Sequence, residues 1–503
     1  MSMPKILAVT ARTISLIVVP DGAKFTLPQH LDWVLTDAAG ATVQSGSSDR
    51  VGIFLEGLHP ETTYDFKCDL GSLQIKTPAC TGLVDASDYG ASPDSSDNSH
   101  ALQKAIRAVP EGGTLRVRPG TFNTAPLFLK PNMTLLLERG CRLSAIGNRA
   151  AWPILNALDE NGRTLGSWEG LPDSSHAALV TAIDCHNLTI TGAGVIDGGG
   201  DTGDWWQWPK ETRNGARRPR TVHLAYCNDV VLSGVTICNS PSWTVHPYLC
   251  ENLHCSNLSI QNPPNSPNTD GLNPESCKSV TLTALHFSVG DDCIAIKAGK
   301  RGTGKNLHLA PTRDIVIQHC LMERGHGAVV IGSEMSGGIH DVTISKCQFL
   351  ATDRGLRIKT RRGRGGEVSD IHLTDVDMVD VPTPLAINAF YFCDPDGKAD
   401  WVQTRTPAPV DETTPSIRNI TMKRVTAQGV TTAAAAVLGL PEAPVTGVQL
   451  CDVAVSYAAN ATPDVPLMSL SVPSMRHASV WAEFANVDGS ITEIDFEKDP
   501  TLC

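Results

Sequence analysis

Four short segments between residues 268 and 360 carry side chains that could act on a sugar. They are Asn268-Thr269-Asp270-Gly271, Gly290-Asp291-Asp292-Cys293, Gly325-His326-Gly327 and Arg357-Ile358-Lys359-Thr360. Neighbouring carboxylates cannot all ionise readily, so one pKa rises and leaves a protonated acid beside ionised bases. A nearby Arg or Lys can hold the carboxylate of an acidic sugar. The set predicts glycoside hydrolysis of an anionic polymer, provided that the fold brings the four segments together.

A repeat of constant pattern but irregular length predicts the elements that would position these segments. Each copy has a small or apolar residue, two variable positions and an apolar strand, as in Cys185-His186-Asn187-Leu188. Further copies begin at residues 227, 250, 277, 312, 339, 368, 417 and 445. The shortest spacing, 23 residues, suits one coil of a solenoid, and longer copies would carry loop insertions. Because no helical pattern fills the spacings, the repeat predicts a parallel β-helix and not βαβ units.

The cysteines support this interpretation. Cys185, Cys227, Cys250 and Cys277 all occupy the first position of their repeat, which predicts an inward-facing ladder, since a solenoid stacks like residues above like. A metal site is the alternative, but metal ligands converge on a point and do not line up along an axis. We therefore expect no metal and no cofactor. The total of fifteen is odd and fits buried small hydrophobes better than a disulfide framework.

Stacking the coils predicts which side chains meet. Neighbouring strands lie about 4.8 Å apart. Aligning the apolar residues that follow each motif places Asp270, Asp292, His326 and Arg354 one coil after another. Asp270 and Asp292 would then stack on adjacent coils with Asp291 beside them. Arg357 and Lys359 are two residues apart on one strand, so both would point the same way.

The chain divides into two predicted domains. Residues 1–80 alternate short apolar strands with turns, predict a small β-sandwich, and resemble in their last strands a fibronectin type III module. Such a module could bind sugar, but a spacer or cap on the larger domain is the favoured interpretation. Residues 84–503 are expected to form the parallel β-helix catalytic domain, with a short amphipathic helix at residues 99–107.

The charge of the chain restricts its partners. A net charge of −12 argues against nucleic acid and against an anionic membrane surface. An acidic polysaccharide or oligosaccharide would need a locally basic cleft. Two clusters could supply one: Lys297, Lys300, Arg301 and Lys305, and then Arg357, Lys359, Arg361, Arg362 and Arg364. Glycines interrupt residues 361–364, so a solvated loop is expected there.

Two observations bear on location. No apolar run reaches the roughly 18–20 residues that a membrane span needs. The first thirteen residues contain Arg12 before any hydrophobic region of useful length forms, which predicts a strand and not a signal peptide. Together with the cysteines, this predicts a cytoplasmic protein, with a secreted or periplasmic location as the alternative.

Each motif alone has a commoner explanation. Asn-Thr-Asp-Gly is usually a turn, Asp-Asp a solvated loop or a cation site, and a histidine between glycines a structural residue. Arg-x-Lys is commonly the solvent face of a strand. Their order on successive coils is what makes the set informative.

With these motifs in this order, residues 84–460 resemble the polygalacturonase family, glycoside hydrolase family 28. The resemblance extends to Asp88-Tyr89-Gly90-Ala91, Arg218-Pro219 and Ser240-Pro241-Ser242-Trp243. It implies a right-handed parallel β-helix that hydrolyses α-1,4-galacturonosidic bonds in polygalacturonate or oligogalacturonides with inversion.

The resemblance also implies a role for each catalytic residue. Asp291 would be the general acid, and His326 would support its protonation state. Asp270 and Asp292 would position and deprotonate the attacking water.

Substrate binding is implied for four further residues. Arg357 and Lys359 would bind the galacturonate carboxylate at the cleaved subsite, and Asn268 is also expected to bind substrate. A tyrosine is expected beyond the Arg-x-Lys strand, and Tyr391 is the candidate, although its surroundings match the family poorly.

The chain departs from common secreted members by its N-terminal module and by an insertion around residues 152–176. The module and the segment Gly332–Gly338 are similar to bacterial exo-acting polygalacturonases, in which insertions close one end of the cleft. This favours an exo-acting enzyme. The tryptophans Trp168, Trp205, Trp206 and Trp208 could form such a wall or a stacking platform, or could simply pack under loops.

Two alternatives belong to other classes. A β-helix polysaccharide lyase would use Asp291 and Asp292 to hold calcium, and a non-catalytic solenoid would only bind polysaccharide. An unsaturated, ultraviolet-absorbing product would identify the lyase, and absence of any hydrolysis would favour the binding protein. The sequence does not predict the oligomeric state.

Overall fold

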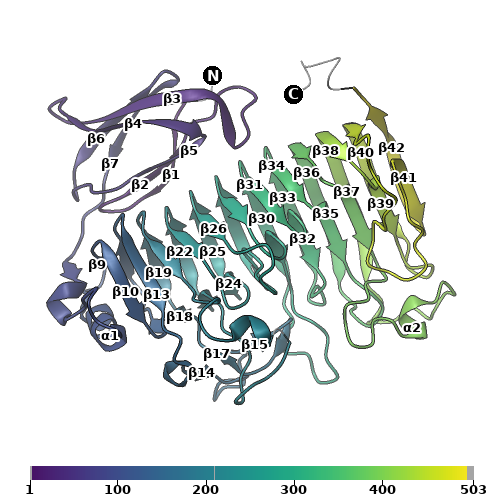
Figure 1. Ribbon diagram of the computed structural model, residues 1–503, viewed down its shortest axis with the longest axis horizontal. Coiled ribbons are helices and arrows are strands. Elements are labelled where there is room, and N and C mark those ends of the chain that lie inside the picture. The colour runs from purple at the N-terminus through teal and green to yellow at the C-terminus, as the bar shows by residue number, and fades with distance from the viewer. Residues whose placement is uncertain (1–2, 209, 496–503) are drawn as a thin grey trace.

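The computed structural model of the chain describes residues 3–208 and 210–495. A small module of purple strands lies along one long side of an elongated stack of coils that runs from residue 83 to residue 493 (Figure 1). Strands dominate both parts. No helix among the described residues is long and apolar enough to cross a bilayer.

The N-terminal module consists of two antiparallel sheets around one buried core. Its strands are β1 (Lys5–Val9), β2 (Ile14–Ile17), β3 (Thr26–Asp37), β4 (Thr42–Arg50), β5 (Gly52–Leu55), β6 (Thr63–Cys68) and β7 (Gly71–Lys76). The sheet orders are β1-β2-β5 and β4-β3-β6-β7. At the start of β6, the hydroxyl of Tyr64 accepts a hydrogen bond from the backbone N–H of His59 at 2.9 Å. Assignment to the fibronectin type III family stays a prediction, as do the domain boundaries.

The coils of the large domain are built from parallel strands, and two short antiparallel pairs lie in the insertion at residues 154–176. One continuous sheet contains β8 (Leu83–Asp85), β9 (Gly113–Val117), β10 (Gly120–Thr124), β12 (Met133–Leu137), β13 (Cys141–Ala145), β19 (His186–Thr191), β20 (Val195–Asp197), β22 (Asn228–Ser233), β23 (Thr236–Cys238), β25 (Glu251–Ser256), β26 (Ser259–Gln261), β27 (Lys278–Thr283), β28 (His286–Ser288), β30 (Thr312–Gln318), β31 (Leu321–Gly325), β33 (Ile339–Ser345), β34 (Gln348–Thr352), β36 (Glu367–Val379), β38 (Ser416–Val430), β40 (Val445–Tyr457) and β42 (Ala485–Glu493). Each of these strands pairs with strands one coil away, so the predicted parallel β-helix is confirmed.

A second face of the solenoid is formed by two shorter parallel sheets in line. The first contains β11 (Leu127–Phe128), β18 (Val180–Ile183), β21 (Val222–Ala225) and β24 (Val245–Tyr248). The second contains β29 (Ile294–Ile296), β32 (Val329–Gly332), β35 (Arg354–Lys359), β37 (Thr383–Asn388), β39 (Ala433–Leu438) and β41 (Ala478–Glu483).

The repeat in the sequence corresponds to a bend that recurs in every coil. The third residue of each copy has a positive φ: Asn187, Asp229, Asn252, Ser279, Asp314, Asp341, Asp370, Asn419 and Gly447. This left-handed conformation costs most residues roughly 1–2 kcal/mol, whereas Gly adopts it freely and Asn and Asp tolerate it. The apolar residues that follow therefore enter the interior at the same point of each coil.

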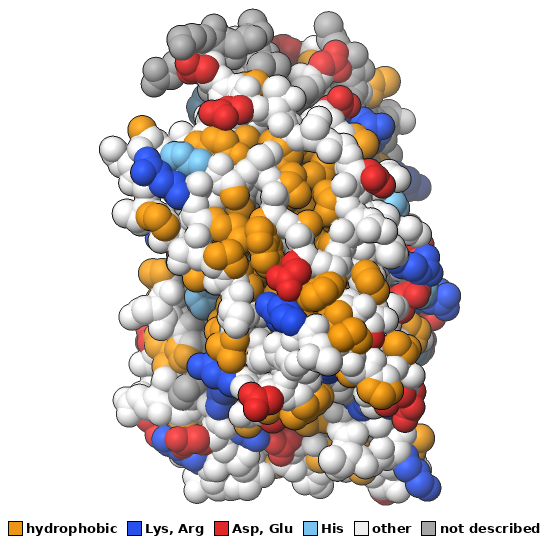
Figure 2. Space-filling view, turned by 90° about the vertical axis from the view of Figure 1, so that its right-hand side faces the viewer, with side chains coloured by type: hydrophobic (Ala, Val, Ile, Leu, Met, Phe, Trp, Pro, Cys, Tyr) orange, Lys and Arg blue, Asp and Glu red, His pale blue; other side chains and the backbone are white. Residues whose placement is uncertain are grey.

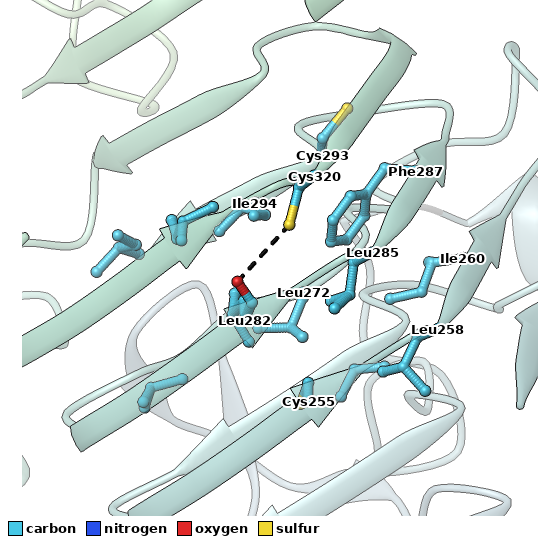
Figure 3. Packing of buried hydrophobic residues seen from close by; sticks show 14 of the residues in the cluster. Cys255, Leu258, Ile260, Leu272, Leu282, Leu285, Phe287, Cys293, Ile294 and Cys320 are labelled. Carbon is cyan, nitrogen blue, oxygen red and sulfur yellow. Dashed lines mark hydrogen bonds between the residues drawn. The ribbon is translucent and has the colours of Figure 1, made fainter. Parts of the chain in front are cut away.

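Like residues stack above like inside the solenoid. Figure 3 shows Ile260 and Phe287 in adjacent layers, and the two are register partners on β26 and β28. The predicted cysteine ladder is also confirmed, since Cys185, Cys227, Cys250 and Cys277 are all buried. Their thiols donate to backbone carbonyls, as Cys277 does to Pro247 at 3.4 Å. All fourteen cysteines of the described residues are free thiols.

The two ends of the solenoid differ. Helix α1 (Ser99–Ala108), predicted from its amphipathic pattern, covers the N-terminal coil and buries Leu102, Ala105 and Ile106. At the other end, Figure 2 shows hydrophobic side chains over much of the face that carries β41 and β42. Helix α2 (Asp400–Gln403) lies in a loop beside this end.

The N-terminal module is attached to the β-helix by hydrogen bonds from a β-helix side chain to the backbone and a side chain of the module. Asn257 donates to the carbonyls of Leu16 and Ile53, each at 3.2 Å, and to the hydroxyl of Ser15 at 2.8 Å. Ala284 of the β-helix belongs to the buried core of the module. These contacts support the role of a packed cap or spacer.

The bend residues generate a stability prediction. Asp314 has φ 58°, is exposed, and stands in the column described above. We expect Asp314→Val to unfold at lower urea concentration than Asp314→Gly, with a difference in unfolding free energy of about 1–2 kcal/mol, because both variants lose the carboxylate but only valine is strained at positive φ. Equal stability of the two variants would contradict the role given to this bend.

Candidate active site

The β-helix brings the four segments onto adjacent coils. Bridges join Leu272 to Ile294 and Ile294 to Val329, so Asp270 lies opposite Asp292, as predicted. The predicted alignment of His326 with Asp292 is wrong by one residue. His326 lies opposite Asp291, and its backbone N–H donates a hydrogen bond to the carbonyl of Asp291 at 3.0 Å.

The site occupies a local break in the sheet. On the second face of the solenoid, the coil that lies between β24 and β29 pairs with them only through isolated bridges at Leu272 and Glu275. Pro274 stands between them and has no N–H to give to a ladder, which explains why a regular strand does not form in this coil. Asp270 therefore belongs to an irregular coil that lies between two regular ones.

A pocket opens at this break. It is lined by Glu169, Lys210, Trp243, Asn268, Asp270, Asp291, Asp292, Lys297, Ser333, Glu334, Lys359, Tyr391, Cys393 and Asp394. Six of the eight predicted site residues are among them, and the other two, His326 and Arg357, contact Asp291 and Asp292. The pocket is almost entirely polar, so its chemistry is set by ionised groups.

Asp292 is held by the Arg-x-Lys strand. Nζ of Lys359 lies 2.7 Å from Asp292 Oδ2, and Nη1 of Arg357 lies 3.7 Å from Asp292 Oδ1. Oδ1 is buried and makes no hydrogen bond to any residue of the described chain. Lys359 also lies 5.5 Å from the centre of the Tyr391 ring, which places the tyrosine beside the two cations. Gly327 leaves room here, since a Cβ would approach Asp292 Oδ1 to 3.3 Å.

Asp291 is paired with His326. Nδ1 of His326 lies 3.2 Å from Asp291 Oδ1. This hydrogen bond raises the pKa of His326 to about 9, so the imidazole carries its proton at neutral pH. Burial alone would raise the pKa of Asp291, but the hydrogen bond and charge of His326 hold that pKa below its ordinary value.

Asp270 has the opposite electrostatic environment. Burial and the charges of Asp291 and Asp292 raise the pKa of Asp270 well above its ordinary value. The amide of Asn273 donates to Asp270 Oδ2 at 2.7 Å, and Lys297 Nζ lies 3.7 Å from the same oxygen. The sequence predicted a raised pKa for one carboxylate of the group, and the structure gives it to Asp270 and not to Asp291.

Asn268 is fixed by a buried arginine. Arg218 is fully buried and donates to the carbonyls of Pro241 at 2.6 Å and Pro267 at 2.9 Å, and to Asn268 Oδ1 at 2.7 Å. This arrangement connects the Arg218-Pro219 and Ser240–Trp243 motifs of the sequence: the arginine clamps the loop that carries Asn268 and Asp270.

Several pocket residues were not predicted as site residues. Glu169 comes from the insertion, which contains β14 (Ile154–Leu155), β15 (Ser167–Trp168), β16 (Leu171–Pro172) and β17 (Ser175–His176). Lys210 follows the turn η3 (Trp205–Gln207), and its Nζ lies 3.0 Å from Glu169 Oε1. Nothing in the sequence pattern shows that these two loops meet. Glu334 and Lys297 were within segments noted for other reasons, the glycine-bounded motif and the first basic cluster.

The tryptophans singled out in the sequence pack under loops. Trp205 stacks on Trp208 with ring centres 5.5 Å apart, and both are buried. Trp168 is buried beneath three arginines, and Trp206 donates to the carbonyl of Ser240. The pocket is lined by Trp243 instead.

The expectation of a solvated loop at residues 361–364 is wrong. Arg361, Arg362 and Arg364 are all buried. Arg361 and Arg364 converge with Lys300 on Asp394, while Arg362 forms an ion pair with Glu442. The interrupting glycines serve a tight loop, because Gly363, Gly365 and Gly366 all have positive φ.

Asp394 generates a second stability prediction. Lys300 Nζ and Arg361 Nε lie 2.7 and 2.8 Å from its carboxylate, and Arg364 also contacts it. Burial alone would raise the pKa of Asp394, but these cations hold it far below its ordinary value. Its stabilising contribution is therefore present above the ordinary carboxyl pKa and is lost only as pH falls through the depressed folded value.

We expect Asp394→Asn to lower the free energy of unfolding by about 3–5 kcal/mol near neutral pH, because it leaves buried cations without their shared anion. Asp396→Asn is the matched control, since Asp396 also binds Arg361 but its side chain is 51% exposed. Urea denaturation of both variants measures the difference, and equal small losses would contradict the role of Asp394.

Comparison with known proteins agrees with this geometry. The model for "Glycosyl hydrolases family 28" matches residues 166–468. A probable polygalacturonase of Vitis vinifera is 32% identical over 382 residues, which are 74% of each chain. The solved structure of an exopolygalacturonase from Thermotoga maritima is 27% identical with a TM-score of 0.67, covering 83% of this chain and 93% of that one.

A second solved structure shares the fold over nearly the whole chain. The family 28 exopolygalacturonase of Yersinia enterocolitica is 19% identical with a TM-score of 0.65, covering 98% of this chain and 99% of that one. Curated relatives include proteins named as endo-acting and as exo-acting. These findings do not support the predicted cytoplasmic location, and a secreted or periplasmic location remains the alternative. The chain belongs to glycoside hydrolase family 28, and its large domain is a right-handed parallel β-helix.

Proposed function

We propose that this protein hydrolyses α-1,4-galacturonosidic bonds, removing residues from one end of polygalacturonate or oligogalacturonides with inversion of configuration. The observation that carries the proposal is the convergence of Asp270, Asp291 and Asp292 in one polar pocket beside Arg357 and Lys359. An acid, a base and a cationic site for a sugar carboxylate are the groups that such a reaction needs.

The proton donor in this proposal is the Asp291–His326 pair. Asp291 is partly exposed in the pocket and would protonate the leaving glycosidic oxygen. His326 carries a proton at neutral pH and contacts Asp291 at 3.2 Å, so it supplies the proton that Asp291 passes on. The role expected for His326 thereby gains a physical basis: the pair holds one proton, and its acidic member faces the substrate.

The water would be activated by Asp270 and Asp292. Asp292 Oδ2 is bound by Lys359 at 2.7 Å, and Oδ1 is the carboxylate oxygen that remains to accept a hydrogen bond from water. Asp270 lies on the adjacent coil and faces the same space. Two carboxylates on one water fix its orientation as well as take its proton.

The sugar carboxylate would bind between Arg357, Lys359 and Tyr391. Both cations lie on one face of β35, and Tyr391 lies beside Lys359. Asn268 also lines the pocket and has its side-chain carbonyl oxygen occupied by Arg218, which leaves its NH₂ group to donate to a substrate hydroxyl.

The exo-acting mode rests on the pocket walls. The Glu169–Lys210 ion pair joins the insertion to the loop after η3 at the pocket, and Asp394, which binds Lys300, also lines the pocket. Loops that close one end of a cleft admit a chain terminus but not the middle of a polymer.

A ladder of oligogalacturonides labelled at the reducing end tests substrate, mode and stereochemistry together. We expect stepwise loss of one small product from the unlabelled end, with the β-anomer appearing first by ¹H NMR and no new ultraviolet absorption. Random internal cleavage would contradict the exo mode, and an unsaturated product would identify a lyase. Binding without cleavage would show a non-catalytic protein.

The proton-donating pair gives a mutational prediction. We expect Asp291→Asn to lower kcat by about 10²–10⁴-fold, because an amide cannot donate the proton. In His326→Ala, Asp291 must hold the proton alone, so the basic limb of kcat/KM should move to lower pH than in the wild type, whose pair loses its proton near the pKa of about 9 for His326. Asp314→Asn, on an exposed bend away from the pocket, is the control, and an unchanged basic limb in His326→Ala would contradict the role of the pair.

A further inference from the structure

Lys297 is a buried cation behind the proposed base. It lies one residue after β29 and its side chain is 4% exposed. Its Nζ contacts three groups: Glu334 Oε2 at 3.0 Å, Asp270 Oδ2 at 3.7 Å and the face of the Trp243 ring, 4.4 Å from its centre. Glu334 and Asp270 are buried as well.

Lys297 keeps its charge in this position. Burial alone would lower the pKa of a lysine, but the charges of Glu334 and Asp270 outweigh burial and raise it above its ordinary value. The same interaction holds the pKa of Glu334 below its ordinary value, although burial opposes it. Both members of the pair are therefore ionised at neutral pH.

The two proposed bases differ in how directly they are neutralised. Asp292 has its own lysine, Lys359, at 2.7 Å. Asp270 has only a distant ion pair with Lys297, which is nearer to Glu334 than to Asp270. Glu334 thus competes with Asp270 for one cation, and the ionisation of Asp270 depends on how that cation is shared.

We propose that Lys297 and Glu334 are positioning residues that set the ionisation of Asp270: Lys297 favours its charged, water-activating form, and Glu334 limits how far it does so. This inference rests on the proposed function, because it assigns Asp270 the role of a base. Neither Lys297 nor Glu334 transfers a proton in it. Their charges act through Asp270.

Other charged groups surround the pair and must be held constant in any test. Those that face Lys297, Glu334 or Asp270 are Asp291, Asp292, Lys359, Glu275, His246, Arg218, Arg220, Lys210 and Arg364. Glu275 accepts from His246 at 2.8 Å, and burial raises the pKa of Glu275 to about 7. Substitutions at Lys297 and Glu334 replace none of these nine residues.

Two nearly isosteric substitutions should move the acidic limb of the pH profile of kcat/KM in opposite directions. A base must be ionised, so activity rises with pH through the apparent pKa to which Asp270 contributes. Lys297→Met removes the favourable cation and should move this limb to higher pH by about one unit or more. Glu334→Gln frees Lys297 for Asp270 and removes a nearby anion, so the limb should move to lower pH.

The double variant provides the matched control. Lys297→Met/Glu334→Gln removes both charges, so its limb should lie between those of Lys297→Met and the wild type. General damage to folding would lower kcat without opposite shifts, and thermal unfolding of each variant identifies such damage. Should Lys297→Met fail to fold, Glu334→Gln and the double variant still give the two limb positions that the inference requires.

The outcomes are distinct. Opposite shifts with the double variant in between support the inference. Limbs that coincide with the wild type, or that move in the same direction in both single variants, overturn it while the proposed function stands. A wild-type protein that hydrolyses no oligogalacturonide overturns both.

Discussion

The constraint on which the site depends is the short distance between coils. Strands about 4.8 Å apart place equivalent residues close together, so a carboxylate on each of two neighbouring coils is an unfavourable pair. The chain offsets this repulsion with cations from coils on either side. Lys359 reaches back to Asp292, His326 to Asp291, and Lys297 lies behind Asp270. The site is a compact set of alternating charges, and each carboxylate has a different cation at a different distance.

Those distances, more than burial, separate the three carboxylates chemically. Burial raises the pKa of every buried carboxyl group, so burial by itself cannot make one of them an acid and another a base. The hydrogen-bonded imidazolium of His326 holds the pKa of Asp291 below its ordinary value. The more distant Lys297 does not offset burial and the charges of Asp291 and Asp292, which raise the pKa of Asp270. The β-helix makes this division possible because each coil contributes its side chains independently, and the coils are held by a continuous ladder on the other faces.

The sequence predicted the elements of the site whose positions follow from the repeat. Asp270 and Asp292 precede apolar strands of recognisable pattern, and their coils are 22 residues apart, so their stacking could be expected. The predicted position of His326 was wrong by one residue because Ala328 and Val329 are both apolar, and either could have faced the interior. A one-residue difference of register is the ambiguity that a pattern of hydrophobic residues leaves wherever two apolar residues are adjacent.

Residues from loops could not be predicted in this way. Glu169 and Lys210 meet because two long insertions fold over the same coil, and neither insertion repeats anything elsewhere in the chain. The arginines at 361–364 were misjudged for a related reason. Glycines between charges suggest solvent, yet here the loop folds back so that Asp394, some thirty residues further along, can gather Arg361 and Arg364. Charge alone does not indicate exposure when a buried partner is distant in sequence.

The arrangement of cations also relates substrate binding to the proposed base. Lys359 and Arg357 are directed at Asp292. A galacturonate carboxylate bound to the same two cations, as proposed, would be a second anion competing for them. The two side chains would then be shared between the sugar and the carboxylate that faces the water, so an acidic sugar would change the charge around that carboxylate. A neutral sugar would leave both cations with Asp292 alone and would lack the ion pairs that hold the acidic one.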